Sequence, residues 1–160
     1  MSSAIDGVAT VVRPGLVAGP GDYSDRFTYW PVRFHRGGRV LVPDTPDQPV
    51  QIIDQRDMAE FTINLIERRE PGTFNVTSPV MRLGDFFNRI NAQVGRDAEI
   101  CPVPVSVLAE NEIETWTQMP LILPYDGSGW GTFEVSVQKA IDAGLKFRSL
   151  EETTQDVLDW

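Results

Sequence analysis

The fold is decided by the stretch Val11-Val12-Arg13-Pro14-Gly15-Leu16-Val17-Ala18-Gly19-Pro20-Gly21-Asp22. A β-branched run stops at a Pro-Gly pair, resumes for a few apolar residues, and breaks again at Gly-Pro-Gly-Asp. This pattern predicts a buried strand that begins at Val8 and ends at Val12, followed by a loop. Because glycine has no side chain, such a loop would let a ligand approach its backbone closely. The alternative interpretation of these glycines is a tight exit from the strand.

The overall composition is that of a globular chain with an acidic surplus. Its 160 residues suffice for a single domain, and 41% of them are hydrophobic. The formal net charge of -9 opposes binding to nucleic acid and to anionic membrane surfaces. No apolar run approaches the roughly 20 residues of a membrane span, and the first residues do not resemble a signal peptide. We therefore expect a cytoplasmic protein with no nucleic-acid partner and no membrane partner.

Short apolar runs bounded by turn residues predict four further strands, at residues 39–42, 50–53, 73–77 and 99–103. Residues 111–131 are rich in aromatic residues and glycine, and we interpret them as a loop. The order of strand, long crossover, strand and helix is typical of an α/β fold with a parallel pair in its core. Because two parallel strands do not form a stable sheet alone, we expect another strand to pair with them.

Apolar positions at helical spacing predict the helices. The first contains Pro31, which either kinks it or marks its first turn. Asp57 opens the second as its N-cap, and Ile66 lies on its predicted buried face together with Met58, Phe61 and Leu65.

Three more helices follow. One carries an apolar face from Leu83 to Val94 and ends at Gly95. Ser136 caps a short helix, and a capping box that starts at Ser149 opens the last one.

Several kinds of catalytic site are excluded by residue counts. His35 is the only histidine and Cys101 the only cysteine, so a metal site and a Ser-His-Asp or Cys-His apparatus lack ligands or partners. A general-base role for Asp54 or Asp57 would require a raised pKa and a cleft. The simpler interpretation is an N-cap at Asp57, with Arg56 pairing locally.

Three segments together resemble the C-terminal part of the extended short-chain dehydrogenase/reductases, the NAD-dependent epimerase/dehydratase family. They are residues 13–22 quoted above, Gln51-Ile52-Ile53-Asp54-Gln55-Arg56-Asp57-Met58-Ala59, and Gly72-Thr73-Phe74-Asn75-Val76. The resemblance implies an α/β fold over residues 1–160 as a single domain. That fold would be the C-terminal part of a Rossmann-like structure, with two parallel strands of the main sheet and a small α/β substrate-binding subdomain.

The resemblance also implies site residues. Pro14, Gly15, Leu16 and Val17 would lie along the nicotinamide end of NAD or NADP. Candidate substrate-binding residues are Arg26, Trp30, Gln51 and Trp116. Leu16 and Ala18 stand where many members carry asparagine and tyrosine. A smaller and less polar substrate than a sugar nucleotide is therefore expected.

The family's glycine-rich turn and its Tyr-x-x-x-Lys pair do not occur in this sequence. Four residues after Tyr23, Tyr29 and Tyr125 stand phenylalanine, arginine and glycine. We therefore expect the N-terminal dinucleotide-binding half to be absent, no catalytic residue in this chain, and no tight binding of NAD or NADP by the chain alone.

Three hypotheses follow from these observations. The chain is the substrate-binding portion of an NAD(P)-dependent reductase or epimerase, or it is a stand-alone, non-catalytic binding or assembly module derived from that family. An enzyme on an unrelated α/β fold would require the three motifs to be coincidence. In the family, the strand from Val8 to Val12 lies between two neighbours, of which only one occurs here. We therefore expect a homodimer through this exposed strand.

Overall fold

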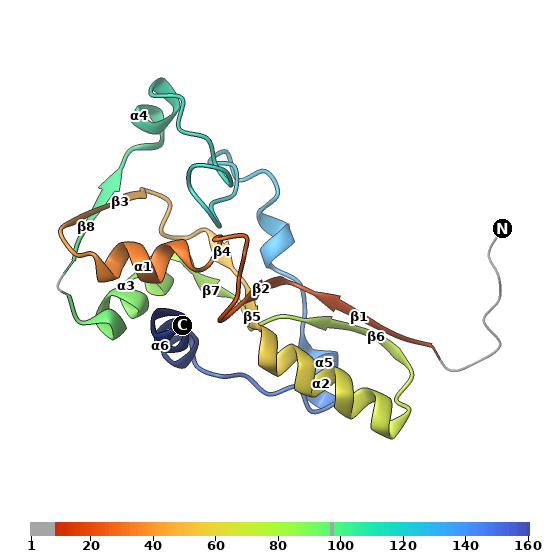
Figure 1. The fold of residues 1–160 in the computed structure, drawn as a ribbon. Helices are drawn as coiled ribbons and strands as arrows, with labels where there is room; N and C mark the ends of the chain where they lie inside the picture. The colour runs from red at the N-terminus through yellow and green to blue at the C-terminus, as the bar shows by residue number, and fades with distance from the viewer. Residues whose placement is uncertain (1–8, 97) are drawn as a thin grey trace.

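The structure, a computed structural model, describes residues 9–96 and 98–160 as an arrangement of short strand pairs and helices (Figure 1). Within this part of the chain, three strand pairs are parallel: β1 (Thr10–Pro14) with β6 (Gly72–Val76), β2 (Leu16–Ala18) with β5 (Ile52–Asp54), and β3 (Arg39–Pro43) with β8 (Glu99–Val103). The strands β4 (Pro49–Val50) and β7 (Met81–Arg82) form an antiparallel pair. The parallel pairs confirm the α/β class.

The described residues contain seven helical segments, five of which form two groups around these strands. They are α1 (Tyr29–His35), α2 (Gln55–Arg68), α3 (Leu83–Val94), α4 (Val105–Glu110), the 3-10 helix η1 (Trp130–Phe133), α5 (Gln138–Asp142) and α6 (Leu150–Asp159). Figure 1 shows α2 and α5 beside the β1–β6 pair, whereas α1, α3 and α6 pack against one another. None of the helices in the described part is long and apolar enough to cross a membrane.

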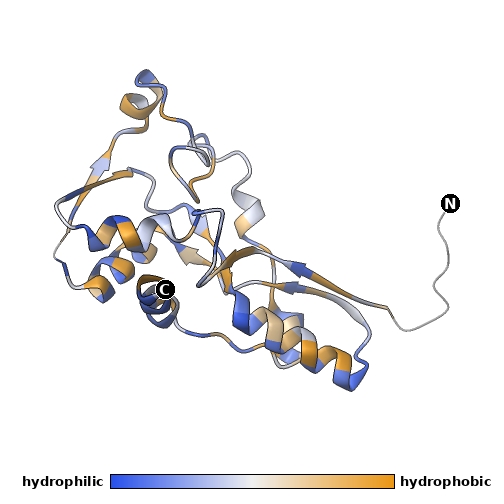
Figure 2. Cartoon of the chain, in the orientation of Figure 1, coloured by the Kyte–Doolittle hydropathy of each residue, from blue (hydrophilic) through white to orange (hydrophobic). Residues whose placement is uncertain are grey.

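Each group of helices has its own apolar cluster. In the larger cluster, aromatic rings of α1 and α3 pack together, and the ring centroids of Trp30 and Phe87 lie 4.4 Å apart. Hydrophobic and hydrophilic residues alternate along α2 and α3 in Figure 2, as expected of helices that cover a core with one face. The smaller cluster joins α2 and α5 to the strands, through Ile53, Phe61, Leu65, Phe74, Val76, Ala140 and Leu145.

The first strand runs further than predicted. Val8 lies outside the described residues, and β1 continues past Val12 to Pro14. Hydrogen bonds to β6 are made by the Ala9 carbonyl and the Gly15 N–H, at 3.1 and 3.0 Å. Backbone groups alternate in direction along a strand, so those of Pro14 point to the opposite edge. Pro14, which has no N–H, therefore does not interrupt the pairing with β6.

The prediction that Asp57 caps α2 is wrong. The helix begins at Gln55, because Asp54 at the end of β5 is the N-cap and accepts a hydrogen bond from the Arg56 N–H at 2.9 Å. The buried face of this helix is also narrower than predicted. Ile66 is 67% exposed, whereas Phe61 and Leu65 are buried.

Other boundaries differ by smaller amounts. The predicted strand at 50–53 is interrupted at Gln51 and forms parts of β4 and β5, and β6 covers 72–76 rather than 73–77. Ser136 does not cap α5, because that helix begins at Gln138 and Val137 precedes it.

Three helix predictions are confirmed. Pro31 lies in the first turn of α1, and the helix at 83–94 ends at Gly95 in a left-handed conformation. The capping box at Ser149 is present, with Glu152 as its partner.

Candidate functional site

The carboxyl ends of β1 and β6 border a cavity of about 720 Å³, a volume typical of ligand pockets. In open α/β sheets ligands bind at this edge, where the loops that follow the strands leave room. The lining includes all four predicted cofactor-binding residues and two of the four predicted substrate-binding residues. The full lining is Arg13, Pro14, Gly15, Leu16, Val17, Asp22, Ser24, Arg26, Asn75, Trp116, Thr132, Phe133 and Val135.

Gly15 is required at the floor of this cavity because the backbone passes very close to Thr77. A Cβ atom at position 15 would lie 2.4 Å from the Thr77 Oγ1 atom, which is far inside van der Waals contact. The Gly15 N–H donates to the Val76 carbonyl at 3.0 Å. The chain leaves β1 through a tight exit at Gly15, which was the alternative interpretation of these glycines. This close approach to Thr77 is the structural reason for glycine at position 15.

A local hydrogen-bonded turn positions Arg26 beside the cavity. The Asp22 carboxylate accepts hydrogen bonds from the Ser24 N–H and hydroxyl, at 2.9 and 2.6 Å, and from the Phe27 N–H at 3.3 Å. Phe27 is buried and packs edge-on against Phe86, with their ring centroids 6.1 Å apart. The backbone on either side of Arg26 is thus fixed at Ser24 and at Phe27.

Aromatic side chains from the second half of the chain form the facing wall. The guanidinium carbon of Arg26 lies 5.0 Å from the ring centroid of Trp116, within the range of a cation–π contact. The ring centroid of Trp116 in turn lies 6.4 Å from that of Phe133, which is buried. Through Trp116, the long aromatic loop at 111–131 therefore reaches Arg26, which follows the glycine-containing loop at 13–22.

The cavity lining is positively charged although the chain is acidic. Among the described residues, its charged groups are the guanidinium groups of Arg13 and Arg26 and the carboxylate of Asp22. Neither arginine forms an ion pair within residues 9–96 and 98–160. The Nε atom of Arg26 is buried and has no hydrogen-bond partner there.

The structure does not bring Trp30 and Gln51 to the cavity. Trp30 is fully buried in the larger apolar cluster, and its indole N–H donates to the Pro120 carbonyl at 2.7 Å. Gln51 is 1% exposed, and its side-chain amide bonds to backbone groups of Ser78 and Val135. Both side chains fasten long loops to the core.

Sequence reasoning missed Arg13, Asn75 and Phe133 as cavity residues. Arg13 and Asn75 belong to quoted motifs, and each lies one residue before the end of its strand, which was an available signal. Asn75 also donates from Nδ2 to the Ser136 carbonyl at 3.0 Å. Phe133 lies in η1, and no local pattern connects it to the first loop.

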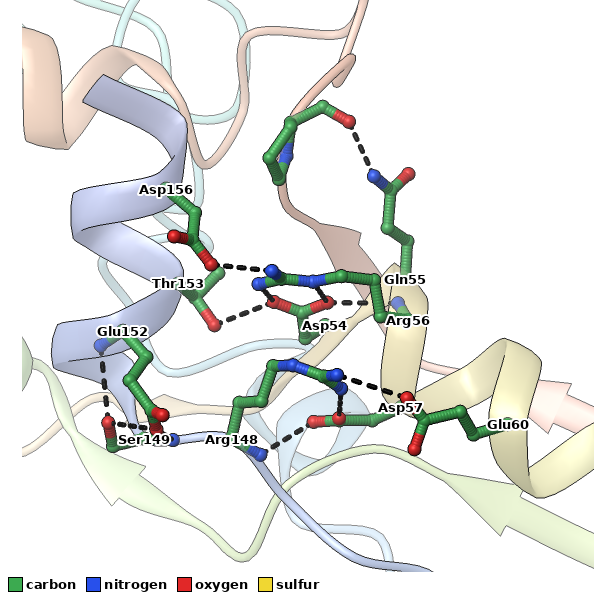
Figure 3. A network of polar contacts seen from close by, with 11 residues as sticks. Asp54, Gln55, Arg56, Asp57, Glu60, Arg148, Ser149, Glu152, Thr153 and Asp156 are labelled. Carbon is green, nitrogen blue, oxygen red and sulfur yellow. Dashed lines mark hydrogen bonds and ion pairs between the residues drawn. The ribbon is translucent and has the colours of Figure 1, made fainter. Parts of the chain in front are cut away.

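A second cluster of polar side chains joins the start of α2 to α6 (Figure 3). We call its members, Asp54, Arg56, Asp57, Arg148, Thr153 and Asp156, the α6 network. The buried Asp54 carboxylate accepts hydrogen bonds from the Arg56 guanidinium at 2.7 and 2.9 Å and from the Thr153 hydroxyl at 2.8 Å. Arg56 also pairs with Asp156, at 2.5 Å.

Arg148 makes the second connection in this network. Its backbone N–H donates to the Asp57 carboxylate at 2.7 Å, and its guanidinium pairs with both Asp57 and Glu60. Figure 3 shows Arg56 between Asp54 of β5 and Asp156 of α6, and Arg148 beside Asp57 and Glu60 of α2.

These contacts argue against a general base at Asp54. Burial by itself would raise the pKa of Asp54, but hydrogen bonds from Arg56 and Thr153 outweigh it and hold the pKa below 3.8. The local pairing of Arg56 is therefore confirmed.

The architecture is the Rossmann-like fold of solved NAD(P)-dependent epimerases and reductases, and the chain covers about half of that fold. No protein-family model and no curated protein sequence matches the chain. Solved structures that match it, in eight examples, share 14 to 20% sequence identity with the chain, so the likeness concerns the fold.

Three of these structures illustrate the likeness. RMD from Pseudomonas aeruginosa, complexed with NADPH, is 17% identical with a TM-score of 0.62, over 94% of this chain and 47% of that one. The UDP-glucose 4-epimerase of Thermus thermophilus, in complex with NAD, is 15% identical with a TM-score of 0.60, over 95% and 46%. The human epimerase family protein SDR39U1, with NADPH, is 20% identical with a TM-score of 0.61, over 94% and 48%. The chain thus spans about half the length of each.

Proposed function

We propose that this chain forms the substrate-binding part of an NAD(P)-dependent reductase or epimerase. In this role Pro14, Gly15, Leu16 and Val17 lie along the nicotinamide end of the cofactor, and Arg26 and Trp116 contact the substrate. The observation that carries the proposal is that these six residues line one cavity at the carboxyl ends of two parallel strands. The solved structures of the same fold that contain NADPH or NAD support it further.

The residues present fit the nicotinamide end of a dinucleotide better than its pyrophosphate. Leu16 and Val17 are half-buried apolar side chains at the floor of the cavity, suited to a flat ring. A pyrophosphate requires backbone N–H groups of a glycine-rich turn at a helix start, and this sequence has no such turn. When bound, NAD(P) would supply or accept the hydride, while these side chains orient its ring and exclude water.

Calorimetric titration with NADPH and NAD tests this proposal. The cavity offers few contacts to offset the translational and rotational freedom that the cofactor loses on binding. We therefore expect a Kd of about 1 mM, equivalent to a binding free energy of about −4 kcal/mol. A micromolar Kd would mean that the chain holds a complete dinucleotide site. Absence of heat at cofactor concentrations several-fold above the expected Kd would contradict the proposal and favour a binding module that does not use the cofactor.

Hydride transfer provides a second test. Because the sequence contains no Tyr-x-x-x-Lys pair, we expect no change in nicotinamide absorbance when the chain is mixed with NADPH and a panel of carbonyl compounds. Turnover that survives further purification would contradict the assignment of proton transfer to residues outside these 160.

The free edge of β1 supports a homodimer as part of the same proposal. Along that edge, the N–H groups of Thr10 and Val12 point away from β6, and no strand in the described part of the chain pairs with them. Val11 beside them is 44% exposed. An unpaired edge of this kind is a template for another strand, and a two-fold dimer satisfies it symmetrically.

Sedimentation equilibrium over a concentration series tests the dimer. We expect a mass of twice 17.9 kDa at high concentration. The variant Val11→Lys adds a charge beside the edge and should shift the equilibrium toward the monomer. A wild-type chain that stays monomeric at high micromolar concentration would contradict this expectation.

A further inference from the structure

Arg26 is a positively charged cavity residue whose guanidinium has no carboxylate partner among the described residues. Its Nε atom is buried and has no hydrogen-bond partner, and no carboxylate pairs with its guanidinium within the described residues. A buried guanidinium N–H without an acceptor opposes folding, because its hydration is lost and not replaced. The Nε atom is enclosed, so a molecule bound in the cavity would meet the other N–H groups of the guanidinium, because Arg26 lines the cavity.

The nearby carboxylate does not fill that role. Asp22 lines the same cavity, but it already accepts hydrogen bonds from Ser24 and from the backbone N–H of Phe27. It therefore closes the turn that positions Arg26 and does not neutralise the guanidinium.

Trp116 determines which part of Arg26 remains available. The indole ring lies against the guanidinium, with 5.0 Å from ring centroid to guanidinium carbon. A guanidinium covered on a face by an aromatic ring still presents its N–H groups at the edge, in the plane that matches a carboxylate. Phe133 extends this aromatic wall beyond Trp116.

We propose that the cavity binds a small organic monocarboxylate, whose carboxylate accepts hydrogen bonds from Arg26 and whose apolar body lies against Trp116 and Phe133. This inference rests on the proposed function, because it names the substrate class of the same cavity. A singly charged ligand is favoured over a phosphate dianion for two reasons. Two guanidinium groups and one carboxylate leave the described lining with one net positive charge, and the whole chain carries -9.

Titration with benzoate and benzamide tests the inference, because the two compounds have nearly the same shape and differ in charge. Ligand-observed NMR on the wild-type chain should give a Kd for benzoate at least about tenfold lower than for benzamide. The variant Arg26→Gln should abolish this difference. The control Arg36→Gln removes the same charge from an exposed side chain outside the cavity and should leave the difference unchanged.

Each other outcome overturns the inference. Equal affinities for benzoate and benzamide would exclude a carboxylate site, and so would an Arg26→Gln variant that retains the preference. Tighter, Arg26-dependent binding of phenyl phosphate than of benzoate would assign the site to phosphates instead. If Arg26→Gln does not fold, the wild-type comparison still decides, together with Arg26→Lys, which keeps the charge and loses the planar fork.

The same samples separate this inference from the proposed function. Benzoate binding without any NADPH or NAD binding would retain the carboxylate site and contradict the cofactor role. Cofactor binding without a preference for benzoate over benzamide would retain the cofactor role and contradict the carboxylate site.

Discussion

The molecule places its arginine side chains in two contrasting environments. In the α6 network, Arg56 pairs with Asp54 and Asp156, and Arg148 pairs with Asp57 and Glu60. In the cavity, Arg13 and Arg26 pair with none in the described part of the chain, and Arg26 instead faces the Trp116 ring. In the first environment both guanidinium groups are paired with carboxylates of the fold. In the second, the guanidinium groups have no carboxylate partner among the described residues, so their N–H groups can bind a ligand.

The difference separates stability from binding. A fully paired arginine contributes to the folded state and has few N–H groups left for a ligand. An unpaired arginine in a cavity contributes little to folding and keeps its donors for a bound molecule. A substitution in the α6 network should therefore lower the free energy of unfolding and leave ligand binding nearly unchanged. A substitution of a cavity arginine should weaken ligand binding and leave the free energy of unfolding nearly unchanged.

The largest effect is expected for Asp54→Ala. This change removes the N-cap of α2 and the buried acceptor of Arg56 and Thr153, and should lower the free energy of unfolding by about 3 kcal/mol. Urea denaturation followed by circular dichroism measures it. The control Asp44→Ala removes an exposed carboxylate and should change stability by less than about 0.5 kcal/mol. Equal effects would mean that the α6 network does not hold the fold together.

A direct contrast comes from replacing one arginine in each region. Arg56→Gln should cost about 2 kcal/mol, because Asp54 stays buried with fewer donors. Arg26→Gln should change stability by less than about 1 kcal/mol, because the lost contact with Trp116 is offset by removal of the buried, unpaired Nε–H. Both values come from the same denaturation experiment. A cost for Arg26→Gln as large as that for Arg56→Gln would contradict the division between the two regions.

The smallest expected effect is a pH dependence of stability through Asp54. Its pKa in the folded chain lies below 3.8, so its stabilisation is fully present above that ordinary value. The stabilisation is lost as the pH falls through the lower, folded-state pKa. Between about pH 5 and pH 2, the free energy of unfolding should therefore fall more steeply for the wild type than for Asp54→Asn. Parallel curves for the two proteins would contradict this assignment.

Local signals explain which elements could be predicted from the sequence. The helix ending at Gly95 and the capping box at Ser149 depend on residues within one or two turns, and both were predictable. The N-cap at Asp54 was missed because β5 leads directly into α2, and no loop residue stands between them. A strand residue that also serves as a cap has no separate sequence pattern.

The candidate site was predictable only in part for a different reason. Its floor lies in one continuous motif, from Pro14 to Val17, which the sequence displays directly. Trp116 and Trp30 were both candidate substrate-binding residues, but the direction of Trp30 is determined by packing against α3. Contacts between distant residues, such as Arg148 with Asp57, carry no local signal.

The most direct test of the account is a residue-resolved NMR titration of the ¹⁵N-labelled chain with NADPH. If the cavity holds the nicotinamide end of the cofactor, the amides of Gly15, Leu16 and Val17 and the side-chain amide of Asn75 should shift together, with one Kd of about 1 mM. Amides of the α6 network should stay in place over the same range. Shifts confined to the α6 network, or no shifts at the cavity, would contradict the account.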